Sequence, residues 1–192
     1  MSARLKAALA AAVLVVLLSG AQGTAALWRA QGSVQAGTVT TGILVLLAGD
    51  GTKAEASHAF TELDTTALVP GGFAQAPLTI SNGGTTDLAY TLHGASTAPP
   101  VRSAADNALA AAAVLTIHAI ADAAACKSNQ ALDPSTALYT GAPNAAASFG
   151  TPQPLPAHSG GGRQLLCVRV SLPVASPQAA AGGVMNLVLS FR

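Results

Sequence analysis

Charged side chains are scarce in this sequence: Asp, Glu, Lys and Arg make up 9% of its 192 residues, against about 25% in typical soluble domains. A folded surface this poor in charge must interact with water through Ser, Thr, Asn, Gln and Gly instead. The composition disfavours a freely diffusing cytosolic enzyme and suits an exported or self-assembling protein. Because Lys and Arg form neither a cluster nor a stripe, we expect no nucleic-acid partner.

Aromatic residues and cysteines are also few. Aromatics make up 4% of the chain and are spread thinly, which disfavours an aromatic platform for carbohydrate. The only cysteines are Cys126 and Cys167, and no CxxC redox motif is present. In an exported protein an even cysteine number predicts a structural disulfide. In the chain-entropy model, closing the loop between the two residues stabilises the fold by about 4 kcal/mol.

Catalytic signatures are missing as well. The sequence contains no GxSxG nucleophile motif and no HExxH zinc motif. The glycines at 160–162 lack the Lys-Ser/Thr of a phosphate-binding loop and precede a predicted strand, so we interpret them as a flexible loop. We therefore predict no catalytic residue, no cofactor and no resident metal, and we do not expect an enzyme.

Isolated polar residues have simpler interpretations. His93 and His118 fall in predicted strands and are expected to face solvent or to act as caps, whereas His58 and His158 fall in predicted loops. Asp50 lies between glycines and is expected to serve a turn. A weak cation site at Glu62 and Asp64 stays open, although a solvated strand end is favoured because the other ligands of a calcium site are not visible.

The first 26 residues carry the order of a secretory signal peptide. Arg4 and Lys6 precede an uninterrupted apolar run at 7–18, and small residues follow up to Ala26. The run is too short to span a bilayer comfortably, although an uncleaved anchor remains an alternative. We predict a signal peptide at 1–26, cleaved between Ala26 and Leu27, and a single secreted domain at 27–192. The signal peptidase would be a partner during export, and the membrane would be contacted only through the signal.

Beyond the signal, short apolar alternations bounded by Gly, Pro, Asn and Asp predict strands and turns. Strands are expected at 38–47, 75–81, 88–92, 114–120, 165–172 and 184–191, with weaker candidates at 59–63 and 137–139. The Asn-Gly-Gly-Thr turn at 82–85 predicts a hairpin between 75–81 and 88–92. A short helix or loop is expected near 105–112, and a long irregular loop at 127–162. The predicted fold is an all-β antiparallel sandwich, jelly-roll-like, preceded by the signal-peptide helix.

Several segments resemble the TasA/camelysin family of bacterial surface and biofilm-matrix proteins, which are exported with a SipW-type signal peptide. The resemblance rests on Gly-Thr-Ala-Ala-Leu-Trp at 23–28, the Thr/Gly-led strand at 37–46, Val-Pro-Gly-Gly at 69–72, Ser-Asn-Gly-Gly at 81–84 and Cys-Val-Arg-Val-Ser-Leu-Pro at 167–173. It implies cleavage near Ala26 and Leu27 and a role in the extracellular matrix. Camelysin relatives have been classed with metallopeptidases, but the zinc motif is missing from this chain.

The leading functional hypothesis is a secreted structural surface or biofilm-matrix protein, possibly a fibre subunit that assembles by adding an N-terminal strand to a neighbour's sheet. Its partner would be another copy or another matrix protein. The predicted assembly strand carries neither charge nor proline, the usual protection of an edge; it comprises Thr38, Val39, Thr40, Thr41, Ile43, Leu44, Val45 and Leu46. The alternatives are a monomeric secreted module that binds a cell surface or cell wall and, by family analogy alone, a metallopeptidase.

Overall fold

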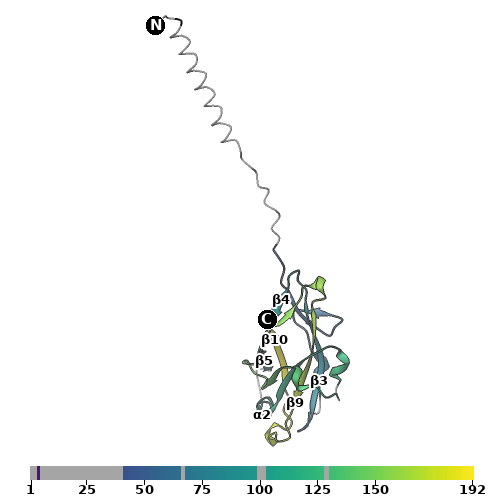
Figure 1. The fold of residues 1–192 in the computed structure, drawn as a ribbon. Helices are drawn as coiled ribbons and strands as arrows, with labels where there is room; N and C mark the ends of the chain where they lie inside the picture. Colours follow the sequence, from purple (N-terminus) through teal and green to yellow (C-terminus); the bar gives the residue numbers. More distant parts are fainter. Residues whose placement is uncertain (1–3, 5–40, 66–67, 99–102, 128–129) are drawn as a thin grey trace. The chain divides into compact units, whose positions relative to one another are not determined.

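Two layers of antiparallel strands face each other across an apolar core (Figure 1). The structure is a computed structural model and describes residue 4 and residues 41–65, 68–98, 103–127 and 130–192. Ten strands lie in this part of the chain, all within one compact unit, Thr41–Arg192. The predicted all-β antiparallel sandwich is therefore confirmed. The expected signal-peptide helix at 1–26 lies outside the described residues.

One layer is a six-stranded sheet in the order β2-β1-β3-β9-β6-β7. Its long central strands alternate between core-facing apolar residues and outer-face residues, as in Leu78-Thr79-Ile80-Ser81 of β3. The strands are β1 (Leu46–Gly49), β2 (Ala54–Glu55), β3 (Phe73–Asn82), β6 (Val114–Ile120), β7 (Ala137–Gly141) and β9 (Arg163–Ser171).

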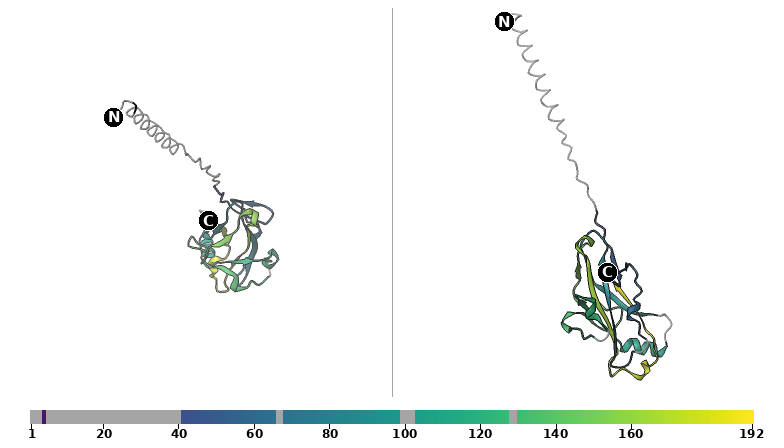
Figure 2. Two further views of the ribbon diagram at one scale, coloured as in Figure 1. Left: turned by 45° about the horizontal axis from the view of Figure 1, so that its top comes forward. Right: turned by 90° about the vertical axis from the view of Figure 1, so that its right-hand side faces the viewer.

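The other layer contains two short strand pairs, seen apart from the larger sheet in Figure 2. β4 (Leu88–Tyr90) pairs with β8 (Gln153–Leu155), and β5 (Leu92–Ala98) pairs with β10 (Asn186–Phe191). Tyr90, Phe149 and Phe191 fill the core behind these pairs, with ring centroids 6.1 to 6.2 Å apart. Three of the seven aromatic residues in the sequence thus meet where tilted and edge-to-face ring contacts help to bind the layers together.

Helical segments are short and lie in the connections. α2 (Ala104–Ala112) confirms the predicted helix near 105–112, and a reciprocal capping box between Ser103 and Asp106 fixes its start. Asp106 also accepts a hydrogen bond of 2.7 Å from the backbone N–H of Val184. The 3-10 turns are η1 (Thr61–Leu63), η2 (Ala123–Cys126), η3 (Pro134–Thr136), η4 (His158–Gly160) and η5 (Gln178–Ala180).

The predicted hairpin between 75–81 and 88–92 is wrong, because the chain changes layers at Asn82. β3 pairs with β1 and β9, whereas β4 pairs with β8 in the opposite layer. Neither Gly83 nor Gly84 has the positive φ of a tight hairpin turn. A side chain on Gly84 would collide with the carbonyl oxygen of Ile43, so this glycine allows two backbones to approach.

Two further predictions need correction. The segment 59–63 contains the 3-10 turn η1 and no strand. The predicted irregular loop at 127–162 holds the expected strand near 137–139, now β7, but also β8, which the sequence did not indicate. The strands predicted at 114–120, 165–172 and 184–191 are confirmed within two residues at each end.

Candidate functional site

The segment predicted as an assembly strand is divided in the structure. Thr38, Val39 and Thr40 lie outside the described residues, as do Ala26 and Leu27 of the predicted cleavage site. Residues 41–45 form no strand, and β1 begins only at Leu46. The prediction of a single strand at 38–47 is therefore wrong for residues 41–45, whereas Leu46 and Leu47 do lie in a strand.

Residues Thr41, Ile43, Leu44 and Val45 lead into the domain beside the turn after β3. The N–H groups of Gly83 and Thr85 donate to the carbonyls of Val45 and Ile43, each at 2.9 Å. The N–H of Ile43 donates to the Thr85 hydroxyl at 3.1 Å. Ile43 and Leu44 remain 59% and 65% exposed, so this lead-in is held by its backbone.

A groove of about 570 Å³ opens between β1 and β10, where the two layers meet at one edge of the sandwich. Its apolar lining comes from both layers and from the segment after β2. These residues include Leu46, Ala48, Phe60, Leu187, Leu189 and Phe191. The groove therefore gives access to the margin of the hydrophobic core, against which all six of these side chains pack.

Both strands that border the groove have unpaired edges. Within the described residues, β10 has β5 as its only neighbour, and β1 pairs with β2 only at Ala48 and Gly49. Leu46 and Leu47 therefore pair on one side only, with β3. β10, with the sequence Asn-Leu-Val-Leu-Ser-Phe, carries no charge and no proline. Natural edge strands usually carry such residues because they prevent pairing with other chains.

His58 supplies an unpartnered polar atom at the same place. Its Nε2 is buried and has no hydrogen-bond partner among the described residues. The ring lies 6.3 Å from the ring of Phe60, centroid to centroid, and both side chains line the groove. A buried ring nitrogen without a partner is costly. The sequence analysis placed His58 in a loop, which is confirmed, but gave no sign of its role in the groove.

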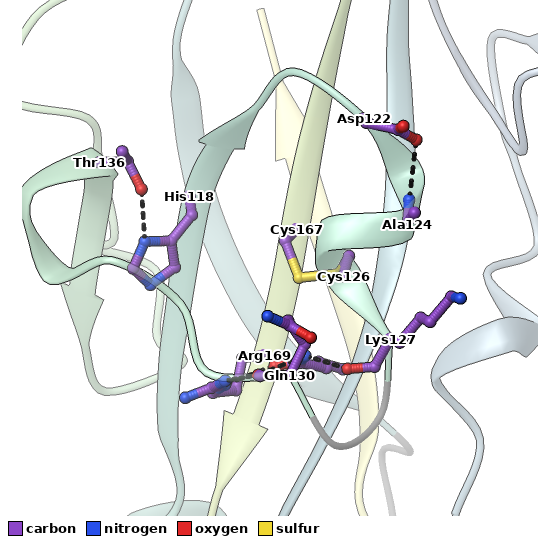
Figure 3. Close-up of a disulfide and its surroundings, with 10 residues drawn as sticks. His118, Asp122, Ala124, Cys126, Lys127, Gln130, Thr136, Cys167 and Arg169 are labelled. Atoms are coloured by element: carbon purple, nitrogen blue, oxygen red, sulfur yellow. Dashed lines mark hydrogen bonds between the residues drawn. A yellow bond between two sulfur atoms is a disulfide. The ribbon is translucent and has the colours of Figure 1, made fainter.

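A disulfide anchors a loop to the outer face of the six-stranded sheet (Figure 3). Cys126 of η2 and Cys167 of β9 are bonded, with their Cα atoms 5.5 Å apart, as the sequence predicted. Both residues are almost fully buried. We call the attached segments 122–127 and 130–136 the strap, because they lie across the outer face.

Side chains from two neighbouring strands hold the strap beside the disulfide. Gln75 of β3 and Arg169 of β9 face each other in register, and Arg169 Nε donates to Gln75 Oε1 at 2.7 Å. The Gln75 amide donates to the carbonyls of Lys127 and Gln130, and the latter also accepts from Arg169 at 2.9 Å. The guanidinium of Arg169 lies 4.2 Å from the ring centroid of Phe73. No sequence pattern indicated these contacts.

His118 is buried under the strap, so the prediction that it faces solvent is wrong. Only 4% of the residue is exposed, and its Nδ1 lies 3.1 Å from the Thr136 hydroxyl. That hydroxyl donates to the carbonyl of Asp133, which leaves it to accept from Nδ1–H. Burial, together with the charge of Arg169, lowers the pKa of His118, so its neutral form is favoured. By contrast, His93 is exposed, as expected, and contacts Arg192.

The carboxylates serve turns. Asp50 Oδ1 accepts from the N–H and hydroxyl of Thr52 and from the N–H of Lys53, as expected for a turn residue. These bonds lower the pKa of Asp50 to about 2. Glu62 and Asp64, considered above as a weak cation site, flank the end of η1 and are exposed. In the described part of the chain, no three His, Cys, Asp or Glu residues are grouped to hold a metal ion.

No helix among the described residues is long and apolar enough to cross a membrane. No protein-family model and no curated protein matches the sequence.

Proposed function

We propose that this protein is an exported structural protein of the cell surface or extracellular matrix that assembles with copies of itself. The N-terminal segment of one copy would add as a strand to the groove between β1 and β10 of the next. Three features support the proposal: the signal-peptide pattern, the resemblance to TasA/camelysin proteins and the open groove. The groove is the observation that carries it.

The groove offers what an added strand needs. The unpaired edges of β10 and β1 present backbone donors and acceptors, and the apolar lining between them accepts alternate side chains. The buried Nε2 of His58 is an additional polar group that an incoming backbone or hydroxyl group can satisfy. An edge without charge or proline is a liability unless something covers it.

The proposed occupant is residues 27–40 of a neighbouring copy. Residues from Leu46 onward belong to the copy's own β1, so only the chain before the lead-in is available. In extended form these fourteen residues span about 46 Å, whereas the six residues of β10 span about 20 Å. The segment therefore has enough length for one strand and a linker. It is uncharged except for Arg29, which suits an apolar groove.

Electron microscopy of two purified forms tests assembly. The first form begins at Leu27 and the second at Thr41, which removes the proposed occupant but keeps all of β1. Filaments from the first form and dispersed particles from the second would support the proposal. Filaments from both forms, or from neither, would overturn it.

A substitution pair locates the contact. Val188 of β10 lines the groove and is 48% exposed, whereas Val174 is 81% exposed and is not among the residues that line it. Val188→Lys places a charge where the added strand would pack and should abolish filaments. Val174→Lys makes the same chemical change elsewhere and should leave them intact. Equal effects of the two substitutions would argue against the groove as the docking site.

The monomeric binding module is the second candidate function. It is favoured by a pocket on the outer face of the larger sheet, which shares only Leu47 with the groove. Dispersed particles from both purified forms would favour this function.

A further inference from the structure

A second cavity, the one that favours the binding-module alternative, lies on the outer face of the six-stranded sheet. It has a volume of about 420 Å³. Leu47, Ser81 and Arg163 form part of its floor and are register neighbours across β1, β3 and β9. The turn 51–54 makes one wall, and residues 158–162 make the other. We call it the outer-face pocket.

The outer-face pocket gathers positive charge in a domain that is otherwise acidic. Residues 41–192 carry all eight carboxylates of the sequence but only six Lys and Arg side chains. Two of these six, Lys53 and Arg163, line the pocket together with His158, and no carboxylate does. Two acidic residues, Asp50 and Glu55, directly flank the lining residues 51–54 in sequence, and Asp50 uses its Oδ1 to hold the wall turn. Their charges moderate the local potential, but neither residue is part of the lining.

The two cations are also unpaired. Arg169 binds Gln75 and Gln130, and Arg192 contacts His93. In contrast, the side chains of Lys53 and Arg163 make no hydrogen bond or ion pair with any residue of the described part. These two exposed cations come from separate elements and meet at one pocket without a counter-ion. Their N–H groups are therefore available to bind an anion.

Hydroxyl groups add neutral donors between the cations. Thr79 and Ser81 of β3 line the floor, and their hydroxyls make no hydrogen bond to other residues in the described ranges. The opposite wall is fixed at Gly162, where any side chain would collide with the carbonyl of Pro156. Thr79 is only 6% exposed, so its position is set by packing. The pocket thus presents donors from its floor and from both walls.

We propose that the outer-face pocket binds a phosphate group. A carboxylate is planar and is satisfied by one Arg in bidentate contact. Donors that arrive from a floor and two walls instead fit a tetrahedral anion with several oxygen acceptors. The pocket volume exceeds that of a single phosphate, so there is room for the group that carries it. That group could be a small phosphomonoester or one unit of a phosphodiester polymer, and both present the same anion.

Amide-resolved NMR tests the proposal. The 192-residue sequence is expressed with a ¹⁵N label, and the protein is purified with whatever N-terminal processing the expressing cell has performed. It is titrated at constant ionic strength with inorganic phosphate, glucose 6-phosphate and a glycerol-phosphate polymer. Sodium chloride and glucose are the controls. We expect saturable shifts of the amides of Thr52, Lys53, Gly161 and Gly162 with the phosphates and none with the controls. Tighter binding of the polymer or of glucose 6-phosphate identifies the source.

Charge substitutions complete the test. Lys53→Gln and Arg163→Gln should each weaken phosphate binding by about tenfold, the usual effect of losing one charge-assisted contact. Lys127→Gln removes an equally exposed charge outside the pocket and should change affinity less than twofold. Equal weakening by Lys127→Gln, or absence of saturable shifts with every phosphate, would overturn the proposal. Because the pocket and the groove share only Leu47 among their lining residues, filament formation is scored separately, and a failure to form filaments does not affect the phosphate result.

Discussion

Replacing Asn82 should destabilise the domain more than any other single polar substitution in the turn after β3. This residue is fully buried where the chain passes from one layer to the other. Its Oδ1 accepts from the N–H of Gly84 at 2.8 Å. Its Nδ2 donates to the carbonyls of Thr86 and Pro156 at 2.8 and 3.0 Å, and more weakly to that of Leu155 at 3.3 Å.

The expected magnitude follows from these bonds. An amide carries only two N–H hydrogens, so Asn82 makes about three effective hydrogen bonds, each worth about 1 kcal/mol net. Asn82→Ala should therefore lower the free energy of unfolding by about 3 kcal/mol. Asn82→Asp keeps the shape but sets a carboxylate against three carbonyl oxygens, so it should cost more at pH 7.

The two variants differ in their response to pH. The introduced carboxyl should have a folded-state pKa above its unfolded value of about 3.9, because the charged form is disfavoured. The destabilisation is then greatest at neutral pH and declines as pH falls through the raised pKa, since the protonated group can donate again. Asn82→Ala should show no such recovery.

The free energy of unfolding of both variants is measured by urea denaturation of the oxidised protein. Circular dichroism is the probe, because it does not depend on a tryptophan signal. Asn186→Ala is the matched control, because Asn186 is exposed at the start of β10 and no hydrogen bond of its side chain appears in the described structure. We expect the control to change the free energy of unfolding by less than about 0.5 kcal/mol. A loss below about 1 kcal/mol for Asn82→Ala, or one equal to the control, would refute the role of Asn82 in joining the layers.

Three other outcomes are expected. The double substitution Cys126→Ala with Cys167→Ala should lower the free energy of unfolding by about 4 kcal/mol in urea; a loss under about 1 kcal/mol would mean that packing alone holds the strap. Tyr90→Phe should cost about 1 kcal/mol by the same assay, because the hydroxyl donates to Gln164 at 2.7 Å; a neutral result would contradict that bond. Because the pKa of His118 is lowered in the folded state, the unfolded state binds more protons, so stability should fall as pH drops below about 6.5. His118→Gln should remove this part of the slope in urea titrations at several pH values, and an unchanged slope would contradict it.

The sequence predicted the strands whose pattern depends only on local alternation. The segments at 114–120 and 165–172 became β6 and β9 because Leu115, Ile117, Leu166 and Val168 supply one apolar face at period two. The disulfide followed from cysteine number alone. Both features can be predicted without knowing which strands pair with each other.

The missed features depend on tertiary neighbours. The glycines after Asn82 look like a hairpin turn, but they serve close approach to the lead-in at Ile43 and Val45, which are forty residues away in the chain. β8 is three residues long and contains Pro154, so its composition argues against a strand until β4 pairs with it. His118 lies on an outer face that would be exposed if the strap did not cover it.

The groove was indicated only indirectly. The absence of charge and proline in β10 was readable as an unprotected edge. However, the sequence analysis looked for that property in 38–47, the strand expected to be donated, and not in the strand that would receive it. The groove itself became visible only when the structure placed β1 and β10 at the same edge of the sandwich.

The position of β9 has a consequence for when the chain can fold. β9 lies between β3 and β6 in the larger sheet, yet it is one of the last strands in the chain. Its contacts with β3 join residues far apart, such as Gln75 and Arg169 at a separation of 94. A growing or partly translocated chain therefore lacks the centre of its larger sheet until its last thirty residues are free. For the export proposed above, this order keeps the chain unfolded during passage through a channel, and folding begins only after almost all of the chain has emerged.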